Sequence, residues 1–157
     1  MIRVLFVCLG NICRSPTAEG VMRTMLAQAG LEAEIAVDSA GTAAYHQGEA
    51  PDRRSQQAAK ARGYDLGGMK ARKVLQIDFS RFDYVLAMDS DNLRQLQALR
   101  PADATAQVML FLDFAKQLGL TDVPDPYYGG AQGFSQVLDL CEAASQGLID
   151  HIRRSIG

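Results

Sequence analysis

The sequence begins with an apolar run that stops abruptly at a short polar loop, and this junction constrains the fold more than any other stretch. Residues 4–7 are all apolar, which is typical of a strand buried on both faces. Gly10 and Asn11 follow in the loop, and Ser15 and Pro16 fit the N-cap and first position of a helix. A loop between a buried strand and a helix N-terminus directs backbone N–H groups and the positive end of the helix dipole at one point. The junction therefore predicts an anion-binding loop.

The loop carries a cysteine at its start and an arginine at its end. A positive field favours the thiolate of Cys8 over its thiol, and the Arg14 guanidinium can hold a tetrahedral oxyanion through two parallel hydrogen bonds. Gly10 and Asn11 tolerate the positive φ that a tight anion-binding nest requires. Ser15 has two open roles, capping the helix and donating a hydrogen bond to the Cys8 sulfur. The simpler alternative, a buried structural cysteine in a Rossmann-like turn, leaves the arginine and serine unexplained. The pattern indicates a nucleophile inside an anion cradle, which suits attack on phosphorus.

The composition places the chain among single-domain globular proteins. Its 157 residues are 48% hydrophobic and 22% charged, enough for one domain over residues 1–157 with a substantial core. A net charge of −2 gives no reason to expect nucleic acid or a membrane surface as a partner. The apolar N-terminal run is too short for a signal peptide, and the three cysteines lack the spacing of a disulfide framework or a zinc site. We therefore expect a cytoplasmic protein.

Apolar strand patterns alternate with helical patterns along the chain. Strands are expected at residues 2–7, 35–37, 82–88 and 108–111, and helices at residues 16–28, 52–62, 90–99 and 132–154. Short, wholly apolar strands separated by helices predict an α/β fold, a three-layer sandwich in which a four-stranded parallel sheet is flanked by helices on both faces. Ligands in such folds bind beyond the carboxyl ends of the strands, where the cysteine loop lies.

A thiolate that displaces an oxygen leaving group from phosphorus requires a proton donor for that group. The chain has two histidines, and His151 lies within the amphipathic last helix. Asp125 is the better candidate, because prolines on both sides hold its backbone in a fixed turn. Taken alone, Asp125 also fits an ordinary Asp-Pro turn.

Three tyrosines are candidate walls of a substrate pocket. Tyr127 and Tyr128 follow Asp125 directly, and two adjacent loop aromatics are rarely both buried, so at least one is expected to line the pocket. Tyr45, in the loop after the second strand, is the candidate for the opposite wall, although an exposed loop tyrosine explains it equally well. Aromatic walls suit a flat phenyl ring.

Four motifs, in this order, resemble those of the low molecular weight protein tyrosine phosphatases: VCLGNICRSP at 7–16, DSAGT at 38–42, FDYVLAMD at 82–89 and DPYYG at 125–129. The resemblance covers essentially the whole chain and implies the fold described above. It implies that Cys8 attacks phosphorus to form a phosphocysteine, while Arg14 clamps the phosphate. Asp125 is then expected to protonate the leaving tyrosine oxygen and to activate water. The backbone amides implied in phosphate binding are those of Leu9, Gly10, Asn11, Ile12, Cys13, Arg14 and Ser15. The resemblance implies no metal and no cofactor.

The resemblance also implies supporting roles around the loop. Asn11 and Ser39 are expected to hold its shape through side-chain hydrogen bonds, and Ser15 to assist the thiolate. Cys13 is implied as the partner of Cys8 in a reversible disulfide that protects the nucleophile. The simpler interpretation of Cys13 is a small buried loop residue.

One departure from the family pattern concerns the support of Asn11. Many relatives have a histidine before the pair that corresponds to Ala71 and Arg72, and it supports the loop asparagine. Met69 and Lys70 stand there in this chain. We therefore expect another group or a water molecule to replace the imidazole.

Three alternative functions remain to be weighed. A thioredoxin-linked arsenate reductase requires two further cysteines in mid-chain, but none lies between Cys13 and Cys141. Protein-arginine phosphatases of the same superfamily tend to carry threonine where Ile12 stands, so Ile12 favours phosphotyrosine. A silent phosphopeptide-binding module should have lost the nucleophile or the acid, and this chain keeps Cys8 and Asp125. The expected partners are a phosphotyrosine protein as substrate and inorganic phosphate as product and inhibitor, with the chain monomeric or weakly self-associated.

Overall fold

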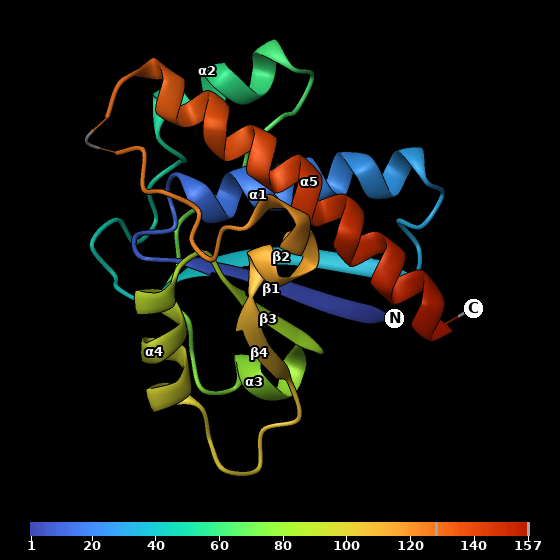
Figure 1. The fold of residues 1–157 in the computed structure, drawn as a ribbon. Coiled ribbons are helices and arrows are strands. Elements are labelled where there is room, and N and C mark those ends of the chain that lie inside the picture. Colours follow the sequence, from blue (N-terminus) through green and yellow to red (C-terminus); the bar gives the residue numbers. More distant parts are fainter. Residues whose placement is uncertain (128, 157) are drawn as a thin grey trace.

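The predicted parallel sheet is present in the computed structural model, which describes residues 1–127 and 129–156 (Figure 1). Its strands are β1 (Ile2–Cys8), β2 (Ile35–Gly41), β3 (Tyr84–Ala87) and β4 (Gln107–Leu110). They are all parallel and lie in the order β2-β1-β3-β4. The α/β fold class is confirmed.

Helices cover both faces of the sheet, as Figure 1 shows. One face is covered by α1 (Arg14–Gln28), α2 (Arg53–Ala61), the 3₁₀ segment η1 (Phe111–Leu118) and α5 (Ala131–Ile156). The other face is covered by α3 (Asp78–Arg81) and α4 (Ser90–Leu99). The three layers enclose one core on each side of the sheet.

Strand β1 is apolar throughout because it contributes to both cores. Val4 and Phe6 pack in the core beneath α1 and α5, whereas Leu5 and Val7 pack in the core beneath α4. All four side chains are fully buried. A strand buried on both faces has a continuous apolar sequence, because each of its side chains enters one of the two cores.

The strand order fixes where the cysteine loop opens. From β1 the chain passes to β2 on one side, and later to β3 on the other side of β1. The carboxyl end of β1 is therefore the point at which the strand order reverses, where open α/β sheets bind ligands.

The end of β2 lies directly against the loop, and only glycine fits there. A Cβ atom at Gly41 would lie 2.7 Å from the Leu9 carbonyl oxygen and 3.2 Å from the Asn11 backbone nitrogen. This close approach lets the Thr42 N–H donate to the Cys8 carbonyl at 2.9 Å and the Ala43 N–H donate to the Leu9 carbonyl at 3.0 Å.

Several elements differ from the sequence-based prediction. Strand β3 is shorter than the predicted 82–88, and α1 begins at Arg14 and not at residue 16. Strand β2 extends to Gly41, beyond the predicted 35–37, because its polar end pairs with the end of β1. Helix α3 and segment η1 were not predicted: α3 has four residues, and η1 contains a kink at Ala115. Neither presents a sustained helical period. Among the described residues, no helix is long and apolar enough to cross a membrane.

Candidate active site

The loop after β1 curls around the sulfur of its first residue. Cys8 is the last residue of β1 and is 3% exposed. Its Sγ lies 3.0 Å from the Ser15 Oγ and accepts a hydrogen bond from the Asn11 backbone N–H at 3.3 Å. Hydrogen-bond donors directed at sulfur stabilise a thiolate.

Ser15 does not cap α1, so that prediction is wrong. The helix begins one residue earlier, at Arg14, and its N-cap residue Cys13 makes no side-chain capping hydrogen bond. The Ser15 Oγ instead accepts a hydrogen bond from the Asn11 Nδ2 at 2.8 Å. The hydroxyl proton of Ser15 then has two acceptors within reach, the Cys8 sulfur at 3.0 Å and the Ala40 carbonyl at 3.4 Å, of which the sulfur is the nearer. Pro16 lies in the first helical turn, where a backbone N–H has no intrahelical partner.

Asn11 supplies the left-handed backbone of the loop. Its φ is +58°, and it is the only non-glycine residue with positive φ in the described part of the chain. The same expectation for Gly10 is wrong, since its φ is not positive. Gly10 is confined sterically, because a Cβ there would lie 3.1 Å from the His46 ring carbon Cδ2.

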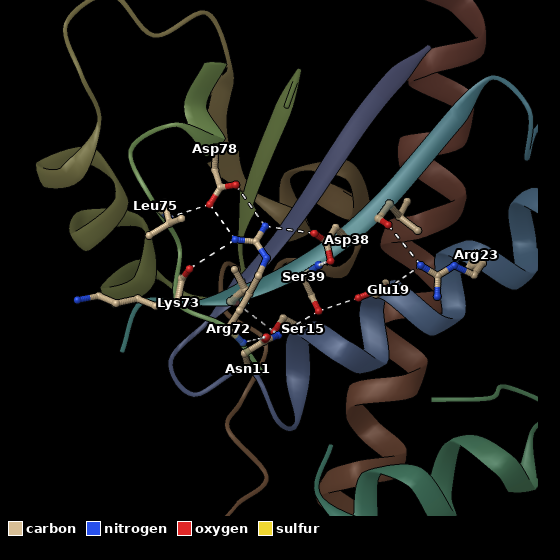
Figure 2. A network of polar contacts seen from close by, with 12 residues as sticks. Asn11, Ser15, Glu19, Arg23, Asp38, Ser39, Arg72, Lys73, Leu75 and Asp78 are labelled. Carbon is tan, nitrogen blue, oxygen red and sulfur yellow. Dashed lines mark hydrogen bonds and ion pairs between the residues drawn. The ribbon is translucent and has the colours of Figure 1, made fainter. Parts of the chain in front are cut away.

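The side chain of Asn11 is held without an imidazole (Figure 2). Its Nδ2 donates to the Ser39 Oγ at 3.0 Å, and its Oδ1 accepts from the Arg72 backbone N–H at 3.0 Å. Ser39 in turn donates to the Glu19 Oε1 at 2.7 Å, and the other Glu19 oxygen accepts from the Arg23 guanidinium at 2.6 Å. Burial raises the pKa of Glu19, against the opposing effect of its bonds to Ser39 and Arg23.

Two carboxylates fix the Arg72 segment that bonds to Asn11. The guanidinium contacts the buried Asp78 at 3.0 Å and Asp38 at 3.2 Å (Figure 2). Asp78 also accepts the Leu75 backbone N–H at 2.8 Å. The Arg72 N–H is thus oriented by ion pairs of its own side chain.

Arg14 is anchored along one side of its guanidinium. It is 3% exposed, and its Nη1 donates to the Asp89 Oδ2 at 2.6 Å and to the Val123 carbonyl at 3.0 Å. The Nη2 lies 3.6 Å from the Asp125 Oδ2. Burial alone would lower the pKa of Arg14, but the negative charges of Cys8, Asp89 and Asp125 outweigh it and raise the pKa. The guanidinium is therefore a fixed positive charge close to the Cys8 sulfur.

These groups open into one pocket of about 320 Å³. Its lining residues are Cys8, Leu9, Gly10, Ile12, Cys13, Arg14, Tyr45, His46, Asp125 and Tyr127. Sequence positions as distant as Cys8, Tyr45 and Asp125 meet here. Asp125 is held to its own loop, since it accepts the Tyr127 backbone N–H at 3.0 Å. Tyr45 is 75% exposed and forms the rim, whereas the predicted wall residue Tyr128 lies outside the described residues.

Two residues of the site were not predicted from the sequence. His46 lines the pocket, with its Nδ1 2.7 Å from a Glu49 oxygen and its ring centroid 6.3 Å from that of Tyr127. Its position next to Tyr45 was the available signal. Asp89 is the second: one of its oxygens caps α4 by accepting the Asn92 N–H, and the other holds Arg14.

Cys13 lines the pocket but is only 5% exposed. Burial raises the pKa of its thiol to about 12. It packs with Ile12, Ala71 and Phe134. Cys13 is therefore protonated near neutral pH, and the three cysteines are free.

Comparison with known proteins identifies the family to which this pocket belongs. The family model described as low molecular weight phosphotyrosine protein phosphatase matches residues 3–156. The chain is 41% identical to the low molecular weight protein-tyrosine-phosphatase YfkJ of Bacillus subtilis, over 98% of this chain and 97% of that protein. The chain belongs to the low molecular weight protein tyrosine phosphatase family.

Solved structures agree with this assignment. A crystal structure of the protein tyrosine phosphatase from Entamoeba histolytica superimposes on this phosphatase with a TM-score of 0.95 and 41% identity, covering 100% of both chains. The Drosophila arginine phosphatase superimposes with a TM-score of 0.90 and 30% identity, covering 96% of this chain and 98% of its own. The enzyme is a protein tyrosine phosphatase, a hydrolase of a family that works through a catalytic cysteine.

Proposed function

We propose that this phosphatase hydrolyses phosphotyrosine through a phosphocysteine on Cys8, with Arg14 as phosphate clamp and Asp125 as general acid and base. The observation that carries the proposal is that these three residues line one pocket of about 320 Å³, with the arginine directed at the acid. A nucleophile, a cation and a proton donor around one cavity are the groups that phosphoryl transfer requires.

In the first step, the Cys8 thiolate attacks phosphorus in line with the leaving oxygen. The S–P bond forms as the bond between phosphorus and the tyrosine oxygen breaks. Asp125 transfers its proton to that oxygen, so tyrosine leaves as the neutral phenol.

Arg14 and the loop amides hold the three remaining phosphate oxygens during this step. Because Asp89 and Val123 already fix one side of the guanidinium, the Nη2 side meets the phosphate without reorganisation. Such preorganised donors are a major source of transition-state stabilisation. The Ser15 hydroxyl, 3.0 Å from the sulfur, stabilises the thiolate before attack and as the leaving group of the second step.

In the second step, water attacks the phosphocysteine. The Asp125 carboxylate accepts a proton from the water, the new P–O bond forms, and the S–P bond breaks. The Cys8 thiolate and inorganic phosphate are the products, which restores the starting enzyme. Inorganic phosphate accordingly competes for the same cradle as the substrate.

Kinetics on two substrates tests these roles. Cys8→Ser is expected to abolish turnover of para-nitrophenyl phosphate while still binding phosphate. Asp125→Asn is expected to lose roughly 10²- to 10⁴-fold in kcat on a phosphotyrosine peptide, and less on para-nitrophenyl phosphate, whose leaving group needs little protonation. Asp103→Asn, at an exposed aspartate outside the pocket, is the matched control. Phosphate release by Cys8→Ser at the wild-type rate, or equal losses of Asp125→Asn on both substrates, would contradict the mechanism.

Phosphotyrosine is favoured over phosphoarginine by Ile12. Its apolar side chain is 8% exposed and lines the pocket, where it suits a phenyl ring better than a guanidinium. The likeness to the Drosophila arginine phosphatase makes phosphoarginine the second candidate substrate. Assays of wild type and Ile12→Thr on both phosphopeptides decide between them, and faster phosphoarginine hydrolysis by wild type would reverse the assignment.

A reversible Cys8–Cys13 disulfide and a cytoplasmic location are further parts of the proposal. Both cysteines are free and lie in one pocket, and a nucleophilic thiolate requires a reducing compartment. Peroxide treatment followed by mass mapping is expected to find the disulfide, and inactivation without it would remove this part. A monomeric or weakly self-associated chain without metal or cofactor stays a prediction.

A further inference from the structure

A second cavity adjoins the active-site pocket across a narrow ridge. Its volume is about 260 Å³, and it is separate from the phosphate cradle. Leu9 and Tyr45 line both cavities. They form the ridge between them and are 37% and 75% exposed, respectively. A ligand that leaves the first cavity over this ridge therefore meets the second one next.

The second cavity has a mixed lining, with apolar side chains beside Thr42 and Gln95, and carries one positive charge. Val74 and Leu96 in its lining are buried, and Leu99 at the end of α4 lies beside them. Lys73 is the only charged residue among the described residues that line it. Figure 2 shows the Lys73 side chain directed away from the Arg72 cluster, and its ammonium forms no ion pair within residues 1–127 and 129–156.

We propose that this cavity is the subsite for an apolar side chain of the phosphoprotein substrate, with an acidic neighbour paired to Lys73. The inference rests on the proposed function of the Cys8 pocket. A protein substrate with its phosphotyrosine in that pocket must carry its backbone over the rim. Because Leu9 and Tyr45 line both cavities, residues close to phosphotyrosine in the substrate sequence are the ones that reach the second cavity.

Continuity with the catalytic pocket and charge complementarity select this occupant. A substrate side chain that enters the cavity also covers the exposed apolar surface of Leu9 and Tyr45. Removing this surface from water favours binding. A substrate carboxylate supplies Lys73 with a partner. By contrast, the pocket wall at His46 is bordered by the carboxylate of Glu49, which disfavours acidic residues there.

Phosphotyrosine peptides in a glycine–serine background test the subsite. Leucine is placed at each position from about three residues before to about three residues after phosphotyrosine, and kcat/KM is measured. One position is expected to raise kcat/KM about tenfold, the effect of partly burying a leucine. Equal kcat/KM at every position would overturn the proposal.

Two variants assign the preference to the cavity. Gln95→Trp fills it from the exposed face of α4 and is expected to abolish the leucine preference. Wild type is expected to hydrolyse peptides with glutamate beside the leucine faster than peptides with lysine there, and Lys73→Glu is expected to reverse this preference. Lys116→Glu, at an exposed lysine of η1, is expected to keep it. A leucine preference that survives Gln95→Trp would contradict the assignment.

Two further outcomes separate this inference from its alternatives. A dimer in sedimentation analysis that Gln95→Trp dissociates, without any peptide preference, would assign the cavity to a second copy of the chain and overturn the proposal. Failure of wild type to hydrolyse para-nitrophenyl phosphate would refute the proposed function, and the inference with it. Hydrolysis of that substrate with uniform peptide kinetics overturns the subsite alone.

Discussion

Replacement of Asn11 tests how the cysteine loop is held without a histidine. Asn11 is 2% exposed and combines three side-chain hydrogen bonds, of 2.8, 3.0 and 3.0 Å, with a φ of +58°. Asn11→Gly removes the hydrogen bonds but tolerates the backbone conformation. Asn11→Ala removes the same bonds and adds the strain of a left-handed alanine.

The structure gives a magnitude for each variant. Three hydrogen bonds, two of them buried, at about 0.5–1.5 kcal/mol each predict that Asn11→Gly lowers the free energy of unfolding by about 1.5–4.5 kcal/mol. Asn11→Ala is expected to lose a further ~1–2 kcal/mol, the strain of the left-handed region. Urea unfolding followed by circular dichroism measures both differences.

Kinetics separates loop geometry from global stability. Both variants release the loop amides and Ser15 from their positions, and a misplacement of about 1 Å lowers kcat by roughly 10²-fold. Asn92→Ala removes another buried asparagine side chain, whose Oδ1 makes no hydrogen bond in the described part of the chain, and serves as control. The reasoning is wrong if Asn11→Gly matches wild type in stability and kcat, or if glycine and alanine at this position behave alike.

Two further changes test the packing and the charge of the supporting structure. A Cβ at Gly147 would lie 1.7 Å from the Phe114 carbonyl oxygen, so Gly147→Ala is expected to lower the free energy of unfolding in urea by about 1–3 kcal/mol. Gly20→Ala is expected to lower the free energy of unfolding less, because its Cβ meets the flexible end of the Leu66 side chain. Equal losses for the two variants would contradict this explanation. Burial raises the pKa of Glu19 above its unfolded value, so the folded state binds the proton more tightly and stability falls as pH rises from about 4.3 towards neutrality. Glu19→Gln is expected to weaken this dependence of the free energy of unfolding on pH, as measured by urea unfolding. An unchanged pH dependence would exclude Glu19 as its source.

Much of the fold was predictable because its signals lie within contiguous stretches. The apolar run of β1 is readable because the strand is buried on both faces, and the long α5 shows a sustained helical period. Helix α3 and segment η1 were missed because neither carries such a period. Of the two roles left open for Ser15, the cap is wrong, because a serine before a proline fits a helix start equally well, and the contact with the Cys8 sulfur is present. Its second partner, Asn11, becomes visible only once the loop is folded.

The candidate site divides in the same way. Cys8 and Arg14 belong to one strand–loop–helix junction, so the sequence by itself predicted the proposed nucleophile, the proposed phosphate clamp and the loop between them. Asp125 was identified by its prolines, but its meeting with Arg14 at 3.6 Å depends on the packing of distant loops.

What only the tertiary structure decided is how that loop keeps its shape. The group that takes the place of the expected histidine is largely the backbone N–H of Arg72, oriented by Asp38 and Asp78. A backbone N–H is present in every residue except proline and leaves no mark on the residue type. The sequence therefore specifies the chemistry of the loop, whereas the contacts that hold Asn11 emerge only when β2 and the Arg72 segment pack against it.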